Sequence, residues 1–197
     1  MLAHIDALHG ACQDALREGA TCMQWRGTVV PAARTVFDSF TGRSTPIDGP
    51  LAGKQQTWLV FSAAIIGYSS MNEICYHLFL RSRLVRYVLG MDESVSERCI
   101  VHSMALYFAC IDGHPDLVDR MIELGAASRG LCFPGSSASY SQNKKAFVDA
   151  VCEGPSNGWT ALMLASMHGH DGCVLRLLDA NADVNKHGPV ELTALME

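Results

Sequence analysis

Apolar residues recur at helical spacing along much of the chain. Residues 2–17 place five apolar side chains on one helical face, which predicts an amphipathic helix; they are Leu2, Ile5, Leu8, Cys12 and Leu16. A second helix is predicted over residues 31–40, followed by a Gly- and Pro-rich linker over residues 41–53. A further helical stretch is predicted over residues 72–89, ending at Gly90.

The longest uncharged stretch runs over residues 55–72 and is mostly apolar. Its eighteen residues just reach the length at which a membrane helix is considered. Polar residues such as Gln55, Ser62 and Asn72 dilute it, however. We therefore expect a buried helix followed by a turn and no membrane span.

A repeat appears in the second half of the chain. The motif Thr-Ala-Leu-Met occupies residues 160–163 and returns at residues 193–196, a spacing of 33 residues. The intervening residues predict one helix-turn-helix unit. Thr160 is suited to cap the first helix, Gly169 to end it, and Asn181 to leave the second helix in a left-handed conformation.

This unit resembles an ankyrin repeat. Residues 157–185 carry a Thr-x-Leu-x-x-Ala opening, a Gly-His turn, a Leu-Leu pair and an Ala-Asp-Val-Asn exit. They depart from the family pattern at Asn181 for glycine, Ala161 for proline and Met163 for histidine. We expect these losses to loosen the helix start, because the family's histidine points inward and ties neighbouring repeats together.

A second copy of the pattern lies upstream, at residues 105–126. Gly113 and Gly125 are separated by twelve residues, as are the matching Gly169 and Asn181. Here Met104 replaces the capping threonine, so the first helix is expected to have a poorer cap unless Ser103 supplies it.

The two Gly-His turns lie 56 residues apart, which implies an insertion of about 23 residues between the repeats. The insertion must fall within residues 128–156, where ankyrin repeats usually have a short hairpin finger. Its Ser-rich part is predicted to be disordered, and residues 144–151 to form a short helix.

The resemblance implies an all-α ankyrin-repeat helical solenoid preceded by an irregular, partly helical N-terminal region. Residues 51–102 fit a degenerate ankyrin-like helix pair, although Thr57 is one residue out of phase with Gly67. The last residues begin a repeat without a second helix, so we expect a fragment of a longer array rather than an imperfect cap. The expected segments are 1–50 (N-terminal region), 51–102 (degenerate pair), 103–127 (repeat), 128–156 (insertion), 157–189 (repeat) and 190–197 (truncated repeat).

Composition and charge narrow the possible functions. With 49% hydrophobic and 18% charged residues, the chain has enough apolar mass for a core and is not disordered. Its net charge of −5 falls entirely in residues 101–197, which argues against a nucleic-acid partner. Eight separated cysteines without a C-x-x-C pair are expected to be reduced core thiols, and the N-terminus lacks a secretory signal. We therefore expect an intracellular, cytoplasmic protein.

Several sequence features suggest chemistry without completing a site. Residues 49–55 resemble a phosphate loop but have three residues between the glycines instead of four, and Gln55 stands where a hydroxyl belongs, so we interpret them as a linker. His168, His170 and Cys173 are three possible zinc ligands without a fourth. We expect no metal, no cofactor and no catalytic residues.

The basic residues Arg81, Arg83 and Arg86 lie together on one predicted helix. They could meet a phosphate group or an anionic lipid, but a solvated helix face is the simpler interpretation.

The resemblance also implies a binding surface. In ankyrin proteins the finger before the first helix and the outward side of that helix line a concave groove, and the matching positions here are Ile111, Asp112, Trp159, Met167 and His168. Trp159 is the best anchor candidate, although packing against the insertion is an equal alternative. The acidic bias of this half suggests a basic or mixed-charge partner.

The function implied is that of a monomeric protein-protein interaction module, an adaptor or scaffold without intrinsic catalysis. The alternative is a fragment of a larger ankyrin-containing enzyme, or of a ubiquitin-ligase substrate receptor, whose active part lies outside this sequence.

Overall fold

A computed structural model describes residues 2–41, 52–69, 85, 88–89, 99–127, 140–151, 158–188 and 193–195 of the chain. The helices in these residues are α1 (Leu2–Arg17), α2 (Cys22–Thr41), α3 (Ala52–Ser69), α6 (Cys99–Asp112), α7 (Pro115–Ala127), α8 (Tyr140–Val148), α9 (Ala161–Met167) and α10 (Asp171–Asp179). Extended pairing within the described ranges is limited to an isolated bridge between Val151 and Thr160. The predicted all-α repeat fold is confirmed.

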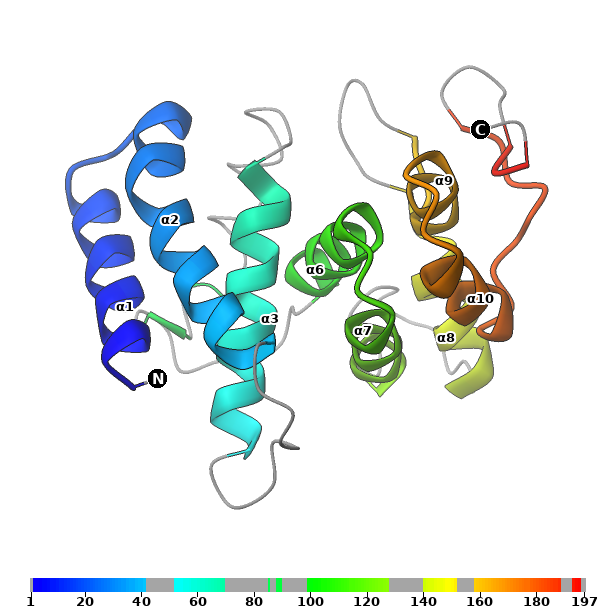
Figure 1. The fold of residues 1–197 in the computed structure, drawn as a ribbon, viewed down its shortest axis with the longest axis horizontal. Coiled ribbons are helices and arrows are strands. Elements are labelled where there is room, and N and C mark those ends of the chain that lie inside the picture. Colours follow the sequence, from blue (N-terminus) through cyan, green and yellow to red (C-terminus); the bar gives the residue numbers. More distant parts are fainter. Residues whose placement is uncertain are drawn as a thin grey trace.

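The helices stack as a row from the N-terminal to the C-terminal part of the chain (Figure 1). Helix α2 packs between α1 and α3, and α3 packs on α6. The pairs α6–α7 and α9–α10 then stack in register, because α6 contacts α9 and α7 contacts α10. This arrangement, first helix on first helix and second on second, is that of a solenoid.

Helix α3 is buried on every side along its second half. All residues from Leu59 to Gly67 are buried, because α2 covers one flank of the helix and α6 another. Gly67 lets α3 and α6 approach closely, since a Cβ there would lie 2.6 Å from Phe108 Cβ and 2.8 Å from the Met104 carbonyl oxygen. The predicted buried helix is confirmed, and no described helix has the length and apolar character needed to span a bilayer.

Helix α1 has the predicted bounds, but α2 and α3 begin earlier than the sequence pattern predicts. Helix α2 begins nine residues before the predicted start, behind Thr21, whose hydroxyl accepts from the Gln24 amide at 3.3 Å while Gln24 Oε1 accepts from the Thr21 amide at 2.8 Å. This reciprocal cap starts the helix early, and Pro31 lies inside it. Helix α3 begins at Ala52, so the predicted linker is too long at its C-terminal end.

The predicted turns of the last repeat are confirmed. Thr160 caps α9, and both Gly169 (φ 68°) and Asn181 (φ 63°) adopt the left-handed conformation that ends a helix. The prediction that methionine in place of histidine at position 163 loosens the start of α9 is wrong. The Met163 amide donates to Thr160 Oγ1 at 3.3 Å, and Met163 Sδ accepts from the Thr160 amide at 3.5 Å, so the thioether closes the cap.

The preceding repeat differs from the sequence expectation at its first cap. Helix α6 begins at Cys99, so Ser103 and Met104 lie inside it and neither caps it. Gly125, which the twelve-residue spacing matches with Asn181, lies inside α7, because the helix continues to Ala127. A Cβ at Gly125 would lie 2.5 Å from ring carbons of Phe147, so this glycine provides space for the insertion helix α8.

Other predictions fall wholly or partly outside the described residues. The Ser-rich part of the insertion (128–139) and Arg81, Arg83 and Arg86 lie outside them. Of the predicted helix over residues 72–89, only Val85, Val88 and Leu89 are described, and the Leu89 amide donates to the Val85 carbonyl at 3.0 Å. The predicted insertion helix is present, but it starts at Tyr140.

Candidate functional site

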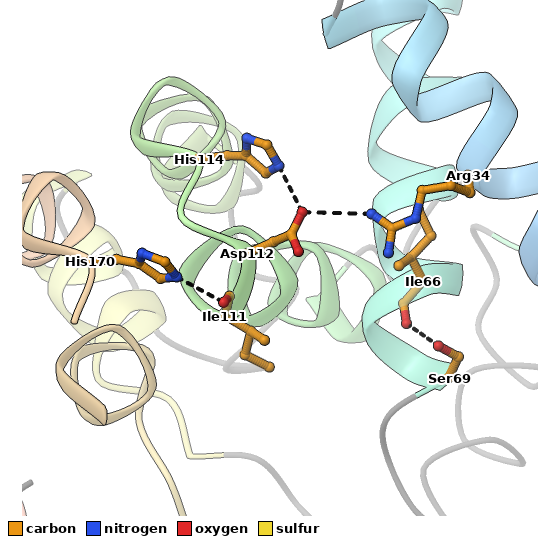
Figure 2. Close-up of polar contacts among 7 residues, drawn as sticks. All are labelled: Arg34, Ile66, Ser69, Ile111, Asp112, His114 and His170. Atoms are coloured by element: carbon orange, nitrogen blue, oxygen red, sulfur yellow. Dashed lines mark hydrogen bonds and ion pairs between the residues drawn. The ribbon is translucent and has the colours of Figure 1, made fainter. Parts of the chain in front are cut away.

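A histidine joins the two clear repeats at the end of α6. Gly113 has a left-handed φ of 76°, and a Cβ there would lie 2.7 Å from His170 Nδ1, so the imidazole packs directly on the turn. His170 Nε2 lies 3.0 Å from the Ile111 carbonyl oxygen (Figure 2). Because a carbonyl only accepts, Nε2 carries the proton and donates. The Gly-His turn of one repeat is thereby fixed to the turn of the previous repeat.

The two possible zinc ligands beside His168 both make contacts between the repeats. His170 donates to Ile111, and the buried Cys173 thiol donates to the Ala109 carbonyl at 3.7 Å. In the part of the chain that the structure describes, no three His, Cys, Asp or Glu side chains are grouped for metal binding.

Asp112, a predicted groove residue, is contacted by the N-terminal region. Its Oδ2 lies 3.0 Å from His114 Nε2 and 3.6 Å from Arg34 Nη1 of α2 (Figure 2). The Arg34 guanidinium also lies over the Phe108 ring, 5.3 Å from its centroid. The Phe37 ring of α2 meets Phe108 edge-on at 5.2 Å. Helix α2 therefore borders the predicted surface, which the sequence did not indicate because nothing marks Arg34 as a long-range partner.

The other predicted site residues lie at the end of α6, at the end of α9 and just before α9. Ile111 is half-buried, with its carbonyl engaged by His170. Met167 is 54% exposed, and the exposed His168 stacks on His170 with ring centroids 6.2 Å apart. Trp159 is half-buried and precedes Thr160, whose backbone pairs with Val151 of the insertion. Both roles considered for Trp159 therefore stay open.

The insertion is tied to the last repeat on the side of the second helices. Asp149 Oδ1 accepts from the Asp183 amide at 2.7 Å, and the Asp149 carbonyl accepts from Lys186 Nζ at 2.6 Å. Lys145 Nζ lies 2.9 Å from Asp149 Oδ2 and donates to the Asn181 carbonyl at 3.1 Å. Its hydrogen bond to Asp149 raises the pKa of Lys145. Together with Phe147 on Gly125, these contacts make α8 a brace between α7 and the exit of α10.

Four cysteines within the described residues are free and buried, as predicted; they are Cys12, Cys22, Cys110 and Cys173. Burial raises the pKa of the Cys12 thiol to about 12. Burial also raises the pKa of Cys110 and of Cys173, and the nearby Cys173 adds to the rise at Cys110. Thiols that stay protonated at neutral pH behave as small apolar groups.

Comparison with known proteins agrees with this geometry. A family model described as "Ankyrin repeats (3 copies)" matches residues 76–188, more than half of the chain. A curated relative, Tyrosine-protein kinase HTK16 of Hydra vulgaris, is 30% identical over 106 residues, covering 48% of this chain. The chain spans 14% of that kinase's length. No solved structure matches it. The chain belongs to the ankyrin-repeat family, whose repeat is a non-catalytic interaction fold.

Proposed function

We propose that this chain is a protein-binding module, an adaptor or scaffold, without catalysis of its own. The partner would contact the C-terminal ends of α6 and α9 and the segment before the α9 cap, through Ile111, Asp112, Trp159, Met167 and His168. We name this set the groove surface.

The observation that carries the proposal is an exposed apolar side chain on a fixed frame. Met167 is 54% exposed at the end of α9, and the next turn is held by the hydrogen bond from His170 to Ile111 and by close packing on Gly113. A thioether adapts to different apolar contacts, and a rigid frame lowers the entropy lost on binding.

The expected partner is a protein with basic or mixed charge, because residues 101–197 carry the net charge of −5. Because salt screens charges, salt should weaken the complex, and salt-insensitive binding to an acidic peptide would contradict the expected charge of the partner. The module would act as a monomer in the cytoplasm and bind no nucleic acid.

Quantitative affinity purification with charge-introducing variants tests the groove surface. Met167→Glu should remove the specific partner, because a buried, unpaired carboxylate at an interface is costly. Leu175→Glu is the matched control, since Leu175 is 61% exposed on α10, outside the groove surface. Loss of the partner with Leu175→Glu but not with Met167→Glu would contradict the proposed surface.

A second candidate is that these repeats are the recognition arm of a larger ankyrin-containing enzyme or ubiquitin-ligase substrate receptor. The similarity to a Hydra tyrosine-protein kinase, of which the matching part is 14%, favours it. An antibody against residues 158–188 would distinguish the candidates on a blot of the source cells. A band near 21.4 kDa supports a separate module, and a much larger band supports the second candidate.

A further inference from the structure

The end of α6 also holds a basic side chain from within the same molecule. Asp112 and Phe108 both contact the guanidinium group of Arg34, and Figure 2 shows the Asp112 carboxylate between Arg34 and His114. His114 donates to Asp112 Oδ2 across 3.0 Å and so orients the carboxylate. The Phe108 ring lies 5.3 Å from the guanidinium carbon.

These groups are the ones that recognise arginine. A guanidinium is planar, donates to a carboxylate and stacks on an aromatic face, whereas an ammonium group lacks the flat surface. Asp112 supplies the negative charge and Phe108 the aromatic face, and both come from the same helix, α6.

The aromatic receptor group is firmly held, whereas the ion pair between Arg34 and Asp112 is exposed. Phe108 is buried, and Phe37 packs edge-on against it at 5.2 Å. In contrast, Arg34 and Asp112 are 44% and 42% exposed and 3.6 Å apart, too far for a strong hydrogen bond. An exposed ion pair of this kind contributes little to stability, so another cation can replace Arg34 at small cost.

We propose that Phe108 and Asp112, with His114 as a positioning residue, form a subsite for an arginine side chain of the protein partner. Arg34 occupies this subsite in the free chain and competes with the partner for it. The inference rests on the proposed function and deepens it, because Asp112 belongs to the groove surface next to Ile111.

Titration with L-argininamide, followed by NMR of backbone amides, tests the subsite without any partner. Arg34→Gln should bind the probe at least threefold more tightly than the wild type, with the largest shifts around Phe108 and Asp112. L-lysinamide should bind more weakly to the same variant. Adding Asp112→Asn to Arg34→Gln should abolish the gain.

Arg176→Gln is the matched control. Arg176 pairs with Asp119 at 3.3 Å, with exposed fractions of 47% and 43%, so this variant frees a similar carboxylate on α7. An equal gain with Arg176→Gln, no gain with Arg34→Gln, or tight binding by the double variant would each overturn the proposal. Such a failure leaves the groove surface at Met167 to be judged by affinity purification, so the two proposals fail separately.

Discussion

The two clear repeats share a turn motif but differ in what surrounds them. His170 of the last repeat donates to the backbone of the preceding turn, whereas the equivalent His114 contacts the Asp112 carboxylate and the Phe37 ring of α2. The helices of the first repeat have 14 and 13 residues, and those of the last repeat 7 and 9. The two repeats therefore share the shape of the turn, while the neighbouring elements determine the helix lengths and the side-chain contacts.

The contact with α2 should give the largest effect on stability. Phe37→Ala should lower the free energy of unfolding by about 3–5 kcal/mol, because it removes a buried ring packed on Phe108 and His114. Urea unfolding followed by circular dichroism measures this change. A loss below about 1 kcal/mol would mean that α2 does not support the first repeat.

The next largest difference is expected between alanine variants of the two turn glycines, Gly113 and Gly169, in the stability that each loses. Gly113→Ala should cost about 3 kcal/mol, because left-handed strain adds to a clash with the His170 ring, where a Cβ would lie 2.7 Å from Nδ1. Gly169→Ala should cost only about 1–2 kcal/mol, since it has the same conformation but nothing within 4 Å of the added Cβ. Equal losses in urea unfolding would contradict the packing of His170 on the turn.

Gly125 and Asn181 occupy matching positions in the two repeats, but substitutions there should change the free energy of unfolding with opposite signs. Gly125→Ala should cost about 2 kcal/mol, because the Cβ would lie 2.5 Å from the Phe147 ring. Asn181→Gly should stabilise the chain by about 0.5–1 kcal/mol, because glycine adopts φ 63° without strain. Thermal melts of both variants test this, and a stabilising Gly125→Ala would show that α8 does not pack there.

Alkaline pH should destabilise the fold through its buried thiols. The raised pKa of Cys12, about 12 against 9.0, leaves its stabilising contribution complete below pH 9 and removes it as the pH rises toward 12. At pH 10 the loss from this thiol is about 1.4 kcal/mol. Cys12→Ala should flatten the dependence of unfolding free energy on pH between 8 and 10. An unchanged slope would contradict the burial of this thiol.

The sequence predicted correctly those features of the fold that depend on residues close together in the chain. The cap at Thr160, the helix end at Gly169 and the left-handed Asn181 depend on a few neighbouring residues, and all three are found as predicted. The role of Gly125 was missed because its constraint comes from Phe147, a residue on another element.

The groove surface itself stays a prediction, but the location of its residues can be compared with the sequence pattern. The pattern named Asp112 and Met167 for the outward side of the first helices, and they are the last residues of α6 and α9. It could not identify Arg34, which reaches Asp112 only after α2 and α3 have packed against α6. The brace through Lys145 and Asp149 likewise depends on where the insertion folds back.

Site-specific photo-crosslinking tests the central claim, that a protein partner binds the groove surface, most directly. A benzophenone amino acid placed at Met167 and, separately, at Leu175 reports contacts from two exposed positions on neighbouring helices. We predict a discrete crosslinked partner from position 167 that is absent from position 175. The same product from both positions, or a product from position 175 alone, would contradict binding through the groove surface.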